Sequence, residues 1–420
     1  MQGANQTGRP AWAATLWVMI ASQVITQVAF SLALPFLPLY IEQLGVSSQN
    51  GAALWAGVSS TASGLAMALF SPLWGRLADR LGRKTMVLRA TFAGVAVVGA
   101  MGLVHSPPPL FLLRLLQGAL TGTVSAANTL VAAVVPERQL GSSMGLMQTA
   151  VLVGVAGGPL LGGAIADAFG YRAAFALTAV LLLVAGLLVL FGAREGQGQL
   201  RAARAAPVPA APLDRRALAP VIVVNFLDQF ANSIAGPVLP LFVGALSTGA
   251  NHGASTATGI VLGSFALSAS VGALISGRLT DRLTPRVVLV ACALGAMVFT
   301  AGQALATSVL ALGLLRAGAG VFIGGTIPAA NVVLGSVTRP ETRGAAFGLT
   351  ASANALGFAA GPLIGALLLH AGYRAPFVVT ALCFGVQAAW VSRRIPAKLA
   401  SVPSEEEQAE QEQAEMTGRA

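Results

Sequence analysis

The chain has 420 residues, of which 55% are hydrophobic and only 10% are charged. A soluble core of this length could not bury so much apolar surface, so the composition excludes a soluble globular protein and indicates a lipid bilayer as the solvent. The formal net charge of +10 does not indicate nucleic-acid binding, because the Lys and Arg residues are scattered over short loops rather than gathered on one folded face.

The apolar residues gather in segments of about 18 to 25 residues, the length that a helix needs to cross a bilayer. These segments lack the alternation of a membrane β-strand, so they predict helices. They lie at 13–39, 52–74, 86–104, 109–133, 143–166, 173–192, 218–243, 256–276, 287–306, 309–335, 345–369 and 375–392. We therefore predict an all-α integral membrane protein with two six-helix bundles at 1–192 and 218–392, a basic linker at 193–217 and an acidic tail at 393–420.

The distribution of basic residues predicts the orientation of these spans. Lys and Arg collect in cytoplasmic loops, and with both termini inside, only Arg172 and Arg374 remain outside. The first span is expected to be an uncleaved anchor, because its apolar stretch is much longer than the core of a signal peptide. The protein is therefore expected in the cell membrane, with both termini in the cytoplasm.

The two halves of the chain are copies of one another. The segment that begins at Gly75 returns 202 positions later at Gly277, and the same offset relates Arg114 to Arg316 and Tyr171 to Tyr373. Two similar bundles that face one another across a pathway are typical of membrane transporters.

The loop between the second and third spans carries the first motif, Gly-Arg-Leu-Ala-Asp-Arg-Leu-Gly-Arg-Lys at 75–84. Gly75 allows close helix approach, Gly82 permits unusual backbone geometry, and Asp79 can cap a helix or pair with an Arg. Acidic and basic residues in a loop can serve only to orient the chain in the membrane and keep the loop soluble. This string, however, resembles the signature loop of the major facilitator superfamily. The resemblance implies a cytoplasmic gate made of Gly75, Asp79, Arg80, Gly82, Arg83, Lys84, Asp281 and Arg282.

The fourth and fifth spans carry two further motifs. Arg114, followed by Gln117 and Gly118, lies where a cation is costly, so it either braces neighbouring helices or takes part in proton handling; the sequence leaves both open. In the fifth span, small residues at four-residue spacing let helices pack closely, and a proline removes a helical hydrogen bond. The full string resembles the antiporter signature of the same superfamily, which implies export, and consists of Gly145, Gly154, Gly158, Pro159, Gly162 and Gly163.

In the seventh span, Asp228 is the one acidic residue near the middle of any span. Intramembrane acids are functional by default, and a carboxyl that binds and releases a proton would couple transport to protons, with Arg114 as an assistant. The alternative is a carboxyl that Asn225 or Asn232 satisfies for packing alone. Drug exporters of this family often carry an acid in the first span, where this chain has only Gln23 and Gln27.

By resemblance, the first, fourth, seventh and tenth spans line the pathway. The expected lining residues are Gln23, Gln27, Phe30, Asn128, Asn225, Gln229, Asn232, Phe322 and Asn331. Together with the string at 34–40, the motifs resemble twelve-span bacterial drug:proton antiporters. We therefore expect export of drugs or similar amphipathic solutes in exchange for protons, or alternatively of a sugar or other metabolite, by a monomer without cofactor or metal.

Three other functions fit the sequence less well. No nucleotide-binding Gly-x4-Gly-Lys-Ser/Thr segment is present, so the proton gradient is the expected energy source. Membrane enzymes cluster reactive side chains at one depth, and no such cluster is visible. A membrane scaffold that transports nothing would not need a buried acid or duplicated hinges.

Overall fold

The computed structural model describes residues 11–194, 215–247, 253–280, 282–338 and 342–396. Within these ranges, 12 helical segments are long and apolar enough to cross a membrane, which confirms the predicted all-α membrane fold. The first six spans consist of α1 (Ala11–Ala33) with η1 (Leu34–Phe36) and α2 (Leu37–Gln43), α3 (Gln49–Leu81), α4 (Arg83–Met101), α5 (Pro107–Leu120) with α6 (Thr123–Val134), α7 (Glu137–Phe169) and α8 (Tyr171–Gly192).

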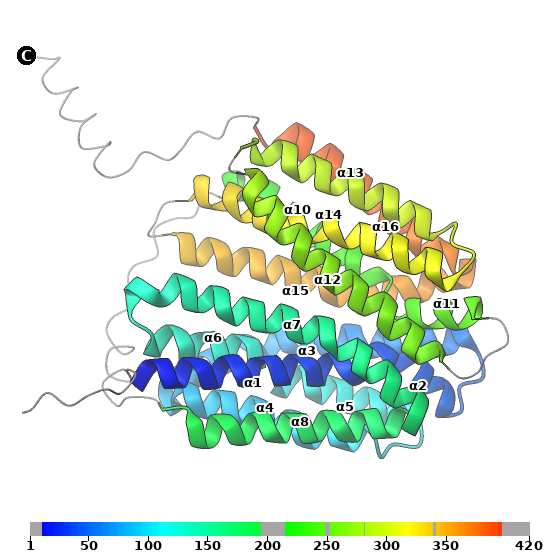
Figure 1. Ribbon diagram of the computed structural model, residues 1–420, viewed down its shortest axis with the longest axis horizontal. Helices are drawn as coiled ribbons and strands as arrows, with labels where there is room; N and C mark the ends of the chain where they lie inside the picture. The colour runs from blue at the N-terminus through cyan, green and yellow to red at the C-terminus, as the bar shows by residue number, and fades with distance from the viewer. Residues whose placement is uncertain (1–10, 195–214, 248–252, 281, 339–341, 397–420) are drawn as a thin grey trace, which may run out of the picture.

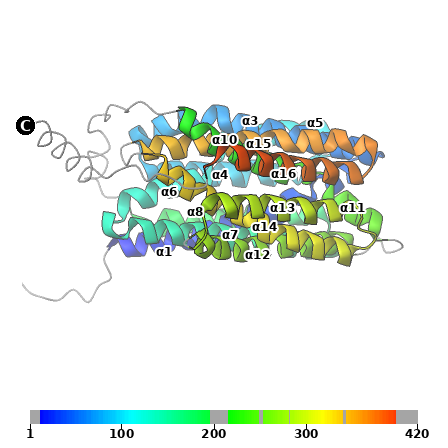
Figure 2. The same cartoon turned by 90° about the horizontal axis from the view of Figure 1, so that it is seen from above.

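The last six spans repeat this order in the second half of the chain. They consist of α10 (Arg215–Ile234) with α11 (Leu239–Leu246), α12 (Ala254–Thr280), α13 (Pro285–Gln303), α14 (Val309–Ser336), α15 (Arg343–Leu368) with η2 (Leu369–Ala371), and α16 (Arg374–Arg394). The two halves form two bundles that lie side by side (Figures 1 and 2). Most of the predicted linker and tail lies outside the described residues.

Three of the predicted continuous helices are interrupted. The first span breaks at Pro35 and the seventh at Pro237, because proline lacks a backbone N–H and disfavours a helical residue before it. The fourth span breaks between α5 and α6, where Gly122 adopts a φ of 120° that only glycine reaches without strain. The predicted spans are therefore correct in position, but these three are not single helices.

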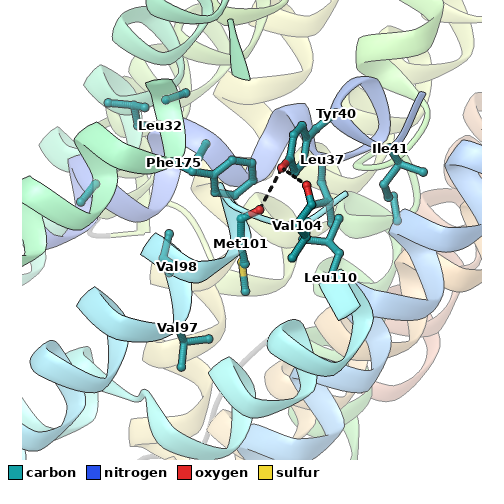
Figure 3. Packing of buried hydrophobic residues seen from close by; sticks show 14 of the residues in the cluster. Leu32, Leu37, Tyr40, Ile41, Val97, Val98, Met101, Val104, Leu110 and Phe175 are labelled. Carbon is teal, nitrogen blue, oxygen red and sulfur yellow. Dashed lines mark hydrogen bonds between the residues drawn. The ribbon is translucent and has the colours of Figure 1, made fainter. Parts of the chain in front are cut away.

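A buried cluster near the outer end of the first bundle fixes the break in the first span (Figure 3). The Tyr40 hydroxyl donates to the Met101 carbonyl at 2.9 Å, and its ring packs against Phe175 with centroids 4.9 Å apart. Tyr40 is 1% exposed, so a buried phenol obtains its hydrogen-bond partner from the free carbonyls at the end of α4. The string that ends at Tyr40 therefore anchors α2 to α4 and α8.

Lys84 and its repeat mate Arg286, which lies 202 positions later, each donate to carbonyls near the carboxyl end of a helix. Lys84 Nζ donates to the carbonyls of Leu190 and Ala193, both at 2.7 Å, at the carboxyl end of α8. In the second bundle, the Arg286 side chain donates to the carbonyl of Ser392 near the end of α16. A cation at a helix carboxyl end satisfies orphan carbonyls and complements the helix dipole. Lys84 thus joins the beginning of α4 to the carboxyl end of α8.

We expect Lys84→Met to lower the free energy of unfolding by about 1 kcal/mol, because two carbonyls lose their donor and the dipole loses its counter-charge. Thermal unfolding of the purified protein in detergent measures the change. Arg76→Met removes a cation from an exposed position in α3, near the same end of the bundle, and is expected to leave the Tm unchanged. Equal Tm values for the two variants would show that Lys84 contributes nothing to stability.

Candidate functional site

The two bundles contact one another along two seams, α7 against α12 and α3 against α15. Along the first seam, a Cβ on Gly163 would lie 2.2 Å from the Ser255 carbonyl, and a Cβ on Gly259 would lie 2.3 Å from that of Pro159. Along the second, Thr61 Oγ1 donates to the Ala359 carbonyl at 2.6 Å. All of these contacts lie in the halves of the helices nearest Arg172 and Arg374, the predicted outer side.

The opposite ends of the same helices lack such contacts among the described residues. A Cβ added at Gly75, Gly145, Gly277 or Gly348 would meet no neighbouring atom within 4 Å. Figure 1 shows α7 and α12 converging toward the end where α12 begins. With the predicted orientation, the contacts among the described residues therefore join the bundles at the outer side rather than beside the basic loops, as in an inward-facing carrier.

The glycines of the antiporter string hold α7 against the first span. Cβ atoms on Gly154, Gly158 and Gly162 would lie 2.5, 2.4 and 1.9 Å from atoms of α1. In the second bundle, Gly357, Gly361 and Gly365 of α15 face α10 in the same way. The string is thus a backbone-to-backbone packing surface, as expected for small residues at four-residue spacing.

Two other members of that string behave differently. Gly163 faces the other bundle, whereas a Cβ at Gly145 would have no near neighbour. Pro159 lies within α7, which continues from Glu137 to Phe169. One helix therefore contacts its own bundle with one face and the second bundle with another.

Asp228 lies inside the second bundle rather than on an open surface. It is 2% exposed, and its carboxyl lies beside the side chains of Thr326 on α14 and Gln387 on α16. Its Oδ1 atom has no hydrogen-bond partner, and neither does the terminal nitrogen or oxygen of Gln387. An ionised carboxylate at this depth is costly without a cation, and no cation of the described residues is close to it.

The neighbouring amides do not satisfy this acid. Asn225 donates from Nδ2 to the Val221 carbonyl of its own helix at 2.9 Å, and Asn232 Oδ1 is buried without a partner. The structure thus gives no support to the alternative in which either amide holds Asp228 for packing alone.

Arg114 is buried within the first bundle. Its guanidinium donates to Gln117 Oε1 one turn further along α5 and to Ser60 Oγ of α3 at 3.4 Å, while Nε has no partner. Its repeat mate, Arg316, stacks over the Phe265 ring of α12 at 4.4 Å from the centroid. Both arginines brace two helices of their own bundle, and the structure does not bring Arg114 and Asp228 together.

The predicted lining residues fall into two groups. Phe30 and Phe322 pack within their own bundles, against Gly94 and Gly295 respectively. Gln23 and Asn225 are buried, Gln27, Asn128, Gln229 and Asn232 are half-buried, and Asn331 is exposed. The amide residues on α1, α6, α10 and α14 remain the predicted lining.

The predicted gate loop turns at Gly82. Gly82 has a φ of 94° between α3 and α4, which explains the glycine at this turn. Arg80 and Arg282 are exposed, and Arg83 is half-buried. Asp281 and the side chain of Asp79 lie outside the described residues, so the expected gate contacts of these acids stay a prediction.

Sequence reasoning did not find the side chains that join the bundles at the outer side. The Asp167 carboxylate of α7 accepts from the Ser255 amide N–H at 3.2 Å, the Thr256 amide N–H at 2.7 Å and Thr256 Oγ1 at 2.6 Å. Tyr171 bonds Ser255 Oγ at 2.8 Å. The repeat that relates Tyr171 to Tyr373 could have pointed to these contacts, because Tyr373 likewise donates to Gln49 of the other bundle.

The chain resembles proteins of one family over nearly its whole length. The family model described as Major Facilitator Superfamily matches residues 19–224 and 221–417. The chain is 34% identical over 396 residues to multidrug resistance protein MdtG of Dickeya zeae (strain Ech586), covering 91% of this chain and 95% of that protein. It is 32% identical over 378 residues to multi-drug resistance efflux pump PmrA of Streptococcus pneumoniae serotype 4 (strain ATCC BAA-334 / TIGR4), covering 89% and 94%.

Solved structures share the same fold at lower identity. A bacterial homologue of the human lysosomal transporter Spinster, in an inward-facing and occupied conformation, has a TM-score of 0.79 at 16% identity and covers 94% of this chain and 100% of its own. The human organic anion transporter MFSD10 has a TM-score of 0.67 at 18% identity, with coverage of 91% and 100%. The chain therefore belongs to the major facilitator superfamily, and it is a multi-pass transporter of small molecules in the inner membrane, not an enzyme.

Proposed function

We propose that this transporter exports small amphipathic molecules, drugs among them, in exchange for protons that move inward. Relatives of more than 30% identity over most of the chain carry the names of multidrug efflux proteins. The antiporter string of α7 favours the same direction of transport. The observation that carries the proton part is Asp228, a buried acid in the middle of a span, which has an oxygen without a partner and no cation beside it among the described residues.

The proton gradient is a sufficient energy source for this exchange. One proton that moves down a membrane potential of 100 mV releases about 2.3 kcal/mol, which sustains a solute gradient of roughly fifty-fold. The transporter acts as a monomer and needs no cofactor in this proposal. Alternating access supplies the coupling: Asp228 takes up a proton in one state of the carrier and releases it in the other.

The experiment is a substrate screen in everted membrane vesicles that contain the carrier. Respiration acidifies the vesicle lumen, and a drug that enters in exchange for protons is expected to raise lumenal pH, reported by recovery of a quenched acridine dye. Vesicles without the carrier are the control. No recovery with any drug but recovery with a sugar or other metabolite would favour the metabolite exporter, and no recovery with any solute would remove the proton exchange.

A further inference from the structure

One polar contact between the two bundles is a helix cap that crosses the outer seam, from α7 to α12. Asp167 lies in the last turn of α7, and its two carboxylate oxygens accept hydrogen bonds from the amide N–H groups of Ser255 and Thr256. These residues form the first turn of α12, where amide donors have no partner within the helix. The first bundle therefore supplies the cap for a helix of the second bundle.

The contact suits a carboxylate rather than a neutral side chain. Two of its three donors are amide N–H groups, and the third is the Thr256 hydroxyl at 2.6 Å. The helix dipole at the amino end of α12 adds a favourable interaction with negative charge. Asp167 is half-buried, so the surrounding water screens this interaction only in part.

The backbones of α7 and α12 contact one another beside the cap, so the cap must break when these two helices separate. Gly163 meets the Ser255 carbonyl one turn below Asp167, and Gly259 meets the Pro159 carbonyl one turn further. An outward-facing state must separate α7 from α12 at this point, because these contacts seal the outer side. Separation removes all three hydrogen bonds of Asp167 in one step.

The second seam offers an internal comparison. There, Tyr373 donates to the amide oxygen of Gln49, and Thr61 donates to a carbonyl. The corresponding segment after α15, η2 (Leu369–Ala371), contains no acid. The charged cap therefore stands on one seam alone among the described residues.

We propose that Asp167 is the latch of the outer gate, a positioning residue that stabilises the inward-facing state by capping α12 from the opposite bundle. The latch sets the ratio of inward-facing to outward-facing carriers, and it carries neither protons nor substrate. This inference requires alternating access by a carrier of this fold, and it does not depend on proton coupling or on the identity of the solute.

The test measures the conformational ratio directly, without drug and without a proton gradient. Spin labels are placed at Ser47→Cys and Thr307→Cys, two exposed outer positions in opposite bundles, after Cys292→Ala and Cys383→Ala remove the native thiols. Electron–electron distance measurement in lipid nanodiscs gives the fractions of closed and open outer gates. Because no transport is measured, failure of the proposed proton exchange leaves this result intact.

Asp167→Ala is expected to shift the closed-to-open ratio toward open by roughly 2- to 30-fold, the range that loss of a helix cap produces. Asp167→Asn retains one acceptor oxygen and is expected to fall between Ala and the parent. Thr256→Val removes one donor of the three with little change in shape, so it is expected to shift the ratio in the same direction by a smaller factor. It serves as the readout if Asp167→Ala does not fold.

Tyr373→Phe is the matched control, because it deletes an outer hydrogen bond on the seam without an acid. Its shift is expected to be smaller than that of Asp167→Ala. A closed-to-open ratio in Asp167→Ala or Thr256→Val that equals the parent ratio would overturn the proposal. So would an equal shift in Tyr373→Phe, which would show that any outer contact has the same effect.

Discussion

Asp228→Asn is expected to abolish proton-coupled efflux, reducing uphill transport to the level of vesicles without the carrier. Asparagine has nearly the same shape and can keep the contacts with Thr326 and Gln387, but it cannot bind and release a proton. Downhill exchange of substrate across the membrane is expected to continue, because the alternating movement itself remains. Drug-dependent dye recovery in everted vesicles measures the first quantity, and exchange of radiolabelled drug measures the second.

The control for this variant is Glu42→Gln, which makes the same change from acid to amide at a half-buried position of α2, away from Asp228. It is expected to retain coupled efflux. The Tm of both variants in detergent establishes that each is folded. Coupled efflux at the parental rate in Asp228→Asn would show that the proton binds elsewhere.

Gly162→Ala is expected to prevent the first bundle from packing and to abolish transport. Its new Cβ would lie 1.9 Å from the Leu32 carbonyl oxygen and 2.8 Å from the carbonyl carbon, both backbone atoms. No rotamer change can relieve this overlap, so α1 must move away from α7. We expect a cost at or above the upper end of the range of about 1 to 3 kcal/mol that overpacking produces.

Gly157→Ala provides a matched control on the same helix. A Cβ at Gly157 would meet no atom within 4 Å, and alanine has the higher helix propensity. Yield of monodisperse protein and its Tm measure both variants. We expect Gly157→Ala to equal or exceed the parent and Gly162→Ala to fall far below it. Equal Tm values would contradict the packing of α7 against α1.

The sequence predicted those features of the fold that depend on local pattern. Apolar run length located the spans, because a bilayer fixes the length of a crossing helix. Glycines at four-residue spacing predicted close helix approach, and the structure shows which helices approach: α7 against α1, and α15 against α10. The repeat predicted two matching bundles.

Tertiary proximity accounts for most of what sequence reasoning missed. Asp167 and Thr256 are 89 positions apart, so nothing local marks the first as a cap for the second. The contacts of Lys84 with the end of α8 depend on how α4 and α8 pack, so its place in the predicted gate loop does not reveal them. The break at Gly122 was also unexpected, because glycine within an apolar run does not by itself specify a positive φ.

Sequence reasoning also could not predict which helices the Asp228 side chain faces. Its spacing of three and four residues from Asn225 and Asn232, with Gln229 beside it, places these residues on one helical stripe. The structure instead buries Asp228 beside α14 and α16, while Gln229 lies near Gly357 of α15. Helical spacing fixes which residues share a face, but only the packing of neighbouring helices decides what that face contacts.

Transport by purified carrier in proteoliposomes tests the central claim most directly. A drug identified in the vesicle screen is supplied at equal concentration on both sides, and a pH difference is imposed with the acidic side within. We predict drug accumulation within the liposomes while the gradient lasts, matched by proton release to the outside, and no accumulation in Asp228→Asn or at equal pH. Accumulation that is the same with and without the pH difference would contradict the account.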